Sequence, residues 1–243
     1  MVFSEYPVLS ISRDLCRLAA VCFNMRKITA IESQKRNPNR VNLYFDDQFA
    51  LGLSRIVAAW LQVGETLSED KIAALLDEDA REVALQKALH FLSYRARSLD
   101  EVRKNLEKHE MPETVIQNTL ERLQTAGLLN DQDFARTWVE NRNTFRPRGR
   151  RALRLELRQK GLPEAVIEST LEEMTDEEAL ALQAARKHLR KMRGLDWLDF
   201  RKKMGGFLSR RGFPYEAIAS VTRQVWQEEH PSGGDHFLEQ EDE

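Results

Sequence analysis

The sequence predicts a mainly α-helical protein of tandem three-helix repeats, preceded by a small β-rich N-terminal module. The strongest observation is a period, because Pro112, Pro163 and Pro214 follow one another at intervals of 51 residues. A fixed period of this length marks one supersecondary unit repeated in tandem. The second observation is composition, since charged residues form 31% of the 243 residues and aromatic residues only 8%. That balance favours a solvated helical array over one thick core.

The same residue types recur at fixed distances from each proline. The residues ten before the prolines are Val102, Leu153 and Met204, and those six before are Leu106, Leu157 and Leu208. The residues one before are Met111, Leu162 and Phe213, and those four after are Ile116, Ile167 and Ile218. Glycine stands two residues before the last two prolines, and Glu110 takes that place in the first copy. We expect the recurring apolar positions to be buried in every repeat.

The chain divides into six segments. They are 1–24, expected to be disordered or an artefact of the assigned start; 25–79, the β-rich module; 80–129, 130–175 and 176–227, the three repeats; and 228–243, a disordered acidic tail. Met25 opens the first strand-like phrase, so we interpret it as the true start. Cys16 and Cys22 lie outside the repeats and cannot staple them, which favours a cytoplasmic protein. No apolar run is long enough to cross a membrane.

The β-rich module is predicted to hold three strands and two short helices. Alternating and β-branched residues predict the strands at 28–32, 41–45 and 49–51. Ser54 is expected to cap a helix that reaches Trp60. Ser68 is expected to cap another that reaches Leu76.

From about residue 80 onward the pattern is helical. The first repeat is expected to hold helices at 83–95, 99–108 and 112–125. Ser98 and Glu101 form a capping box for the middle helix. Pro112 suits the first turn of the third helix, where no backbone N–H is needed, and Gly127 ends that helix. Asn130 caps the first helix of the second repeat.

The aromatic residues are interpreted mainly as packing residues. We expect Trp60, Trp138, Trp197 and Trp226 to lie in the core or in seams between helices. Tyr94 stands beside Arg95, where a ring can stack on a nucleic-acid base. Packing within the fold is the favoured interpretation of Tyr94.

The net charge of −2 conceals strong segregation of charge. Residues 142–160 hold eight basic side chains and one acid, and residues 186–211 hold ten Lys or Arg and two acids. Residues 228–243 hold seven acids and no Lys or Arg. Basic blocks of this kind suggest an anionic partner, of which nucleic acid is the commonest.

The middle helix of the second repeat is the favoured binding element. Arg150, Arg151, Arg154 and Arg158 fall on one arc of about 100° beside the apolar seam. The alternative is a solvated charged face, which ordinarily mixes both signs. Exposed cations in the first turn of a helix cost roughly 0.3–1 kcal/mol each. Two arginines there without visible compensation therefore indicate a binding function.

The candidate partner- and DNA-binding residues share a long cationic side chain in or near these blocks. They are Arg95, Arg97, Arg142, Arg146, Arg148, Arg150, Arg151, Arg154, Arg158, Lys160, Arg210 and Arg211. Arg201, Lys202 and Lys203 form a weaker cluster. Phosphate contacts need only such cations on a common face, so base-specific recognition is not inferred.

Signals for catalysis are poor. The five histidines form no H-E-x-x-H pair, and no phosphate-binding or dinucleotide glycine motif occurs. Asp131 and Asp133 are interpreted as first-turn acids behind Asn130, not as metal ligands. Cys16 and Cys22 lack partners at zinc spacing. We therefore predict a protein that is not an enzyme and has no catalytic residue, no cofactor and no metal.

Five phrases of the sequence resemble the RecX family of recombination regulators. They are Phe91-Leu-Ser-Tyr-Arg-Ala-Arg-Ser-Leu-Asp-Glu-Val102, Gly127-Leu-Leu-Asn-Asp-Gln-Asp-Phe-Ala135, Arg146-Pro-Arg-Gly149, Glu156-Leu-Arg-Gln-Lys-Gly161 and Arg210-Arg-Gly-Phe213. The likeness covers about 80–227, and the 26–67 region looks like the N-terminal part of longer members. The N-terminal module and the acidic tail depart from the short members.

The resemblance implies an elongated, curved array of three-helix repeats. It implies a monomer that binds the RecA recombinase filament on single-stranded DNA, within the filament groove. It also implies restraint of RecA's ATP hydrolysis, strand exchange and coprotease activity in recombination and DNA repair. The family has no catalytic residue that we transfer, so the binding residues above rest on charge alone.

Two other functions remain open. One is a sequence-specific DNA-binding regulator whose three-helix units act as helix-turn-helix modules. Three unlike repeats without dimer symmetry argue against it. The other is a protein-binding solenoid scaffold, against which the arginine-rich helix argues.

Overall fold

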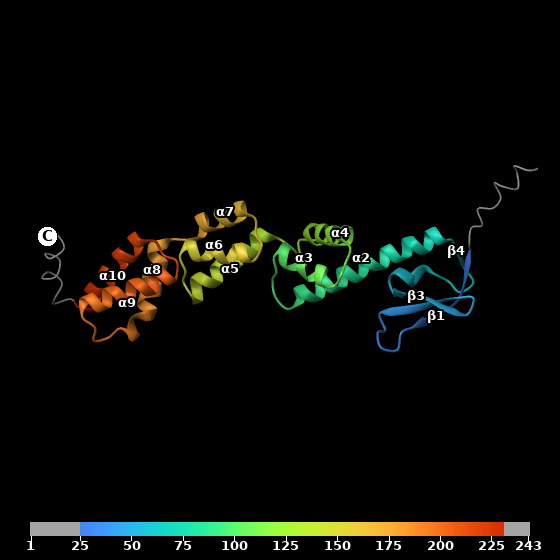
Figure 1. Cartoon of the computed structure of the whole chain (residues 1–243), viewed down its shortest axis with the longest axis horizontal. Coiled ribbons are helices and arrows are strands. Elements are labelled where there is room, and N and C mark those ends of the chain that lie inside the picture. Colours follow the sequence, from blue (N-terminus) through green and yellow to red (C-terminus); the bar gives the residue numbers. More distant parts are fainter. Residues whose placement is uncertain (1–24, 231–243) are drawn as a thin grey trace, which may run out of the picture. The chain divides into compact units, whose positions relative to one another are not determined.

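The computed structural model describes residues 25–230, so the predictions made for 1–24 and 231–243 lie outside the described residues. Two compact units divide between Gln86 and Lys87. The described part of the first unit carries a small sheet and the second carries the helical repeats (Figure 1). This confirms the predicted fold class of a β-rich N-terminal module followed by tandem three-helix repeats.

The sheet of the first unit is antiparallel, with strand order β3-β2-β1-β4. Its strands are β1 (Arg26–Ser33), β2 (Arg40–Phe45), β3 (Gln48–Ser54) and the short β4 (Thr66–Leu67), which the sequence pattern did not predict. Asp46 and Asp47 connect β2 to β3 with φ of +49° and +64°, the left-handed conformation that a tight hairpin turn requires. Ile28, Leu43 and Leu53 are fully buried between the sheet and the helix that follows it.

A short helix ends at Trp60 as predicted, but its predicted cap by Ser54 and the predicted burial of Trp60 are wrong. Ser54 is the buried last residue of β3, and its Oγ accepts no hydrogen bond from any described residue, so it does not cap a helix. The short 3-10 helix η1 (Val57–Trp60) begins without a side-chain cap, and Trp60 is 89% exposed instead of buried.

Helix α2 (Glu69–Ser93) runs without a break where two helices were predicted, ending at 76 and resuming at 83. The residues between carry charges but no glycine or proline, so nothing stops the helix there. Ser68 caps it as predicted, since its Oγ accepts from Lys71 N at 3.3 Å. The predicted boundary between residues 79 and 80 therefore falls inside α2.

The remaining helices form the repeats. After the C-terminal part of α2 come α3 (Leu99–Lys108) and α4 (Glu113–Thr125); then α5 (Asp131–Phe145), α6 (Arg150–Gln159) and α7 (Glu164–Met174); then α8 (Glu177–His188), the 3-10 turn η2 (Leu189–Lys191), α9 (Trp197–Arg210) and α10 (Tyr215–Glu229). In Figure 1 each set of three groups together along the second unit. α10 continues past the predicted tail boundary at 228, and Glu228 pairs with Arg186 at 2.8 Å.

Burial confirms the predicted repeat register at ten of the twelve recurring apolar positions, whereas Met111 and Ile218 are only half-buried. Leu106, Leu157 and Leu208 have no exposed surface, and neither do Val102, Leu153 and Met204. The capping box of Ser98 and Glu101 and the Asn130 cap are present as predicted. Pro112 was predicted to lie in the first turn of α4. It is instead the N-cap, the residue just before the first turn, with an extended ψ of 144°.

The tryptophans of the repeats lie in seams as predicted. Trp138 packs against the core of the second repeat, and Trp197 and Trp226 pack against that of the third. Tyr94 is 71% exposed, and the ring contact and hydrogen bond that it makes within residues 25–230 are both with His90, so the favoured packing role is wrong.

Neighbouring repeats contact one another at positions that obey the same 51-residue period. Ser98 at the start of α3 donates its Oγ–H to Lys160 O at 2.6 Å, and Gly149 at the start of α6 donates its N–H to Arg211 O at 3.0 Å. Gly161 and Gly212 follow these two acceptors with positive φ and lie against the preceding repeat. The start of each middle helix therefore docks on the turn after the next repeat's middle helix.

Candidate functional site

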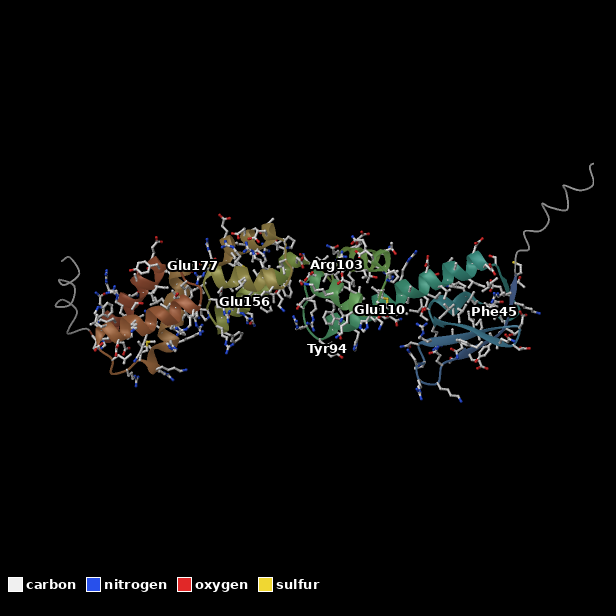
Figure 2. All side chains as sticks on the ribbon, in the orientation of Figure 1. Phe45, Tyr94, Arg103, Glu110, Glu156 and Glu177 are labelled. Atoms are coloured by element: carbon white, nitrogen blue, oxygen red, sulfur yellow. The ribbon has the colours of Figure 1, made fainter. Side chains whose placement is uncertain are left out.

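Glu156 of α6 gathers two of the candidate arginines. Its Oε2 accepts from Arg142 Nε at 2.7 Å and from Trp138 Nε1 at 2.8 Å. Arg148 pairs with its other carboxylate oxygen. The one acid of the basic block, labelled in Figure 2, is therefore a hub that orients Arg142 and Arg148 and offsets part of their charge.

Glu101 plays the matching part at the junction of the first and second repeats. Lys160 Nζ lies 2.8 Å and Arg95 Nη2 3.0 Å from its Oε1. Burial opposes ionisation of Glu101, but the hydrogen bonds from Lys160 and Arg95 outweigh burial and hold its pKa below its ordinary value. Arg95 and Lys160 are far apart in sequence and meet on this carboxylate.

The four arginines of α6 are not a uniform cationic surface. Arg154 donates to both carboxylate oxygens of Glu168 at 2.5 and 2.7 Å, and Arg158 does the same with Glu164 at 2.8 and 2.6 Å. Glu164 and Glu168 belong to α7, so the neighbouring helix supplies the negative charges that α6 itself lacks. Arg151 is exposed and has no charged partner in the part of the chain that the structure describes.

Arg150 is a junction residue. Its side chain donates to Thr175 Oγ1 at 2.7 Å and to Thr175 O at 2.9 Å, while its backbone N–H donates to Glu177 Oε1 at 2.7 Å. Glu177, labelled in Figure 2, thereby places an acid at the N-terminus of α6. The apparent lack of compensation at this helix start is a mistaken expectation, because α8 provides the missing charge. Burial raises the pKa of Glu177 above its ordinary value.

The candidate residues around Arg146-Pro147-Arg148 converge with the end of α9. Arg211 donates to Pro147 O at 2.9 Å and lies 4.6 Å from the Phe207 ring centre. Burial lowers the pKa of Arg211, and the nearby charges of Arg148 and Arg146 lower it further. These three arginines therefore concentrate positive charge at the junction of the second and third repeats.

Arg97 and Arg210 lie apart from that concentration. Arg97 stacks over the Phe91 ring at 4.0 Å, and its buried Nε has no hydrogen-bond partner among the residues that the structure describes. Arg210 lines a separate cationic hollow with Lys203 and His188. Burial lowers the pKa of His188, and neighbouring cations including Arg210 lower it further.

Two hollows that the sequence did not reveal lie beside α6, α9 and α10. One of about 590 Å³ is lined by Arg150, Arg151, Arg154, Glu177, Gly205, Ser209, Gly212, Phe213, Pro214, Tyr215 and Ile218. The other, of about 320 Å³, is lined by Trp197, Arg201, Lys202, Gly205, Tyr215, Ile218, Ala219, Thr222 and Arg223. A usable signal existed, because Tyr215 follows the repeat proline where the earlier repeats have Glu113 and Glu164.

Metal binding and membrane insertion find no support in the residues described. Within 25–230, no group of three or more His, Cys, Asp or Glu side chains is placed to hold a metal ion. Nor does any helix in that range combine the length and apolar character of a membrane span. The arrangement is suited to binding an anionic partner through guanidinium and ammonium groups.

Comparison with known proteins gives matches along the chain. Four family models match in order: the regulatory protein RecX N-terminal domain at 26–68 and the first, second and third RecX three-helix domains at 84–123, 130–171 and 176–222. A regulatory protein RecX of Bacillus velezensis is 33% identical over 202 residues, which is 82% of this chain and 77% of that protein.

Further relatives agree. The regulatory protein RecX of Bacillus subtilis is 31% identical over 82% of this chain and 76% of its own length. A crystal structure of regulatory protein RecX superposes with a TM-score of 0.64 and 29% identity, covering 81% of this chain and 98% of that one. With identity at this level sustained over most of both sequences, the chain belongs to the RecX family of regulatory proteins.

Proposed function

We propose that this protein is a non-enzymatic regulator that binds RecA recombinase filaments on single-stranded DNA. In this proposal it modulates, mainly by inhibition, RecA's ATP hydrolysis, strand exchange and coprotease activity in recombination and DNA repair. The observation that carries the proposal is membership of the regulatory family, with all four family domains matched in order. The protein acts in the cytoplasm as a monomer.

The charge distribution of the second and third repeats supports the proposal. Arg146, Arg148 and Arg211 converge at one junction, and Arg151 on the adjoining helix is exposed and has no charged partner among the described residues. A filament on DNA presents phosphates, which long cationic side chains recognise without base readout. Contacts of this kind favour binding along a nucleoprotein filament irrespective of sequence.

The proposal is tested by co-sedimentation with RecA filaments on single-stranded DNA, compared with the same DNA alone, alongside RecA ATP hydrolysis. We expect the protein to pellet with filaments and to slow hydrolysis. A protein that binds naked DNA as well as it binds filaments, and leaves hydrolysis unchanged, would contradict the proposal and favour a DNA-binding regulator.

The α6 arginines are tested in the same assay. Replacing Arg150, Arg151, Arg154 and Arg158 with Gln should weaken filament binding and flatten its dependence on salt. Arg103→Gln controls for the loss of one exposed ion pair, because Arg103 pairs with Glu113 at the repeat position that Arg154 occupies in the second repeat. Equal filament binding by the parent and the fourfold variant would show that the α6 arginines are only a solvated, paired face.

A further inference from the structure

The two hollows beside α9 and α10 adjoin each other, because Gly205, Tyr215 and Ile218 line both, and we treat them together as one groove. We refer to it as the repeat-3 groove. Its walls come from α6 at one end and from α9 and α10 at the other.

The earlier repeats fill the equivalent position with side chains. In the first repeat Arg103 pairs with Glu113 at 2.5 Å and donates to Gln117 at 3.1 Å. In the second repeat Arg154 reaches Glu164 at 3.8 Å and Glu168 at 2.5 Å. Adding the 51-residue period to these positions gives Gly205, Tyr215 and Ala219 in the third repeat. All three replacements line the repeat-3 groove, so a charged cluster has given way to open space and one aromatic ring.

Packing does not explain the glycine of this set. A Cβ on Gly205 would meet only Ile218 Cγ2, at an ordinary distance of 3.7 Å, and its φ is not in the left-handed region. Glycine inside a helix lowers stability relative to alanine, and it is used where something must approach the backbone closely. Gly205 therefore leaves the backbone of α9 accessible at the bottom of the groove, although glycine lowers the stability of this helix.

The ring of Tyr215 is displayed over this floor. Its side chain is 77% exposed, and among the described residues neither the ring nor the hydroxyl has a partner. An exposed aromatic face beside cations is the pattern that binds unpaired bases, because every base offers a face for stacking. In a duplex those faces are already stacked on one another, so a strand recognised here must be single.

Free cations stand along the groove. Arg151, Lys202 and Arg223 line it and have no charged partner in the part of the chain described. Arg151 and Lys202 occupy the same repeat position in successive repeats. Glu177 is the one acid among the described lining residues, and its Oε1 accepts from Arg150 N. The groove thus carries an excess of positive charge suited to a phosphate backbone.

We propose that the repeat-3 groove binds a segment of single-stranded nucleic acid, with a base stacked on Tyr215, the strand against Gly205, and phosphates near Arg151 and Lys202. The inference deepens the proposed function and rests on it, because the strand would be the one that the filament carries. An acidic peptide of the recombinase would use the same cations but would have no need of the ring.

The first experiment measures binding of a fluorescent oligothymidylate to the protein without recombinase. Tyr215→Leu should weaken binding by about 5- to 150-fold, the factor that matches the loss of one stacked base. Tyr215→Phe should bind within about twofold of the parent, since stacking does not need the hydroxyl. Cross-linking with 5-iodouracil in the strand should label residue 215 in the parent.

The second experiment separates the groove from helix stability. Gly205→Ala should raise the melting temperature, because alanine favours the helix, yet weaken oligothymidylate binding by narrowing the groove. Gly206→Ala is the matched control. It changes helix preference equally, but Gly206 does not line the groove and its added Cβ would meet only the flexible end of Arg210. Gly206→Ala should leave binding unchanged.

The outcomes separate this inference from the proposed function. If Tyr215→Leu and Gly205→Ala bind oligothymidylate like the parent, or cross-links map away from the groove, the inference is overturned. Normal co-sedimentation of those variants with filaments would then leave the proposed function standing. If the variants bind oligothymidylate normally but lose filament binding, the occupant is a recombinase segment, which also overturns the inference. A parent that binds oligothymidylate in the groove but ignores filaments would overturn the proposed function alone.

Discussion

The turn between α6 and α7 gives a quantitative test of how the repeats are joined. Gly161 has φ of +74°, and a Cβ on it would lie under 3.0 Å from Cβ, Cγ and Oδ2 of Asp100 in the preceding repeat. The Cβ of Asp100 is fixed to the backbone of α3, so it cannot swing aside. Gly161→Ala therefore has a conformational cost and a separate steric cost.

The magnitudes follow from these two terms. A residue with a side chain in the left-handed conformation costs roughly 1–2 kcal/mol relative to glycine. Forcing extra volume into a packed contact costs typically about 1–3 kcal/mol. We therefore expect Gly161→Ala to lower the free energy of unfolding by about 2–5 kcal/mol. Urea unfolding followed by circular dichroism measures this loss.

Gly127→Ala is the matched control. Gly127 ends α4 in the same hydrogen-bonded motif, with Leu128 N donating to Leu123 O at 3.0 Å. Its φ is +68°, but an added Cβ would meet nothing within 4 Å. It should show only the conformational cost of roughly 1–2 kcal/mol. Equal losses at 161 and 127 would refute the inference that the first two repeats are locked together through this turn.

Glu110 occupies the repeat position of Gly161 and Gly212, but it lies in the first repeat, so no earlier repeat packs against it. Glu110, labelled in Figure 2, is exposed and has φ of +57°, whereas the later copies have glycine at this position. Glu110→Gly relieves the left-handed strain but adds freedom to the unfolded chain, so we expect a change between none and a gain of about 1.5 kcal/mol. A clear loss of stability would mean that the Glu110 side chain makes contacts that the structure does not show.

Further predictions concern the core, the Glu156 hub and one titrating group. Leu106→Ala, Leu157→Ala and Leu208→Ala should each lower the free energy of unfolding by about 2–5 kcal/mol in urea, and a neutral variant would show that the repeat register fails there. Glu156→Gln should cost about 1–3 kcal/mol, since it removes a charged acceptor from two arginines, and a change below about 0.5 kcal/mol would contradict the hub. Because burial and then neighbouring cations lower the pKa of His188 in the folded state, stability should fall as the pH drops below 6.5, the ordinary histidine value. Urea unfolding at several pH values should show a shallower fall in His188→Gln, and equal slopes would exclude the effect.

The sequence by itself determined the features that depend on near neighbours or on the period. The Ser98–Glu101 capping box joins residues three apart, and the Asn130 cap involves the two residues at positions 132 and 133, so both can be read locally. The buried positions Leu106, Leu157 and Leu208 follow from repetition, because equal units bury equal positions. Local patterns were weaker at the start of the chain, where charged residues within α2 were mistaken for a break between helices.

Only the tertiary structure decided which cations are available. Arg154 finds Glu168 fourteen residues away, and Arg150 N finds Glu177 twenty-seven away, distances that no helical wheel can relate. Pairing depends on which helix faces pack together. Packing gives Arg154 and Arg158 acidic partners and gives Arg150 a threonine, so among the described residues Arg151 is the α6 arginine without a partner. The repeat-3 groove arises in the same way, because Gly205 and Tyr215 meet across two helices and their substitution opens space only when the helices are packed.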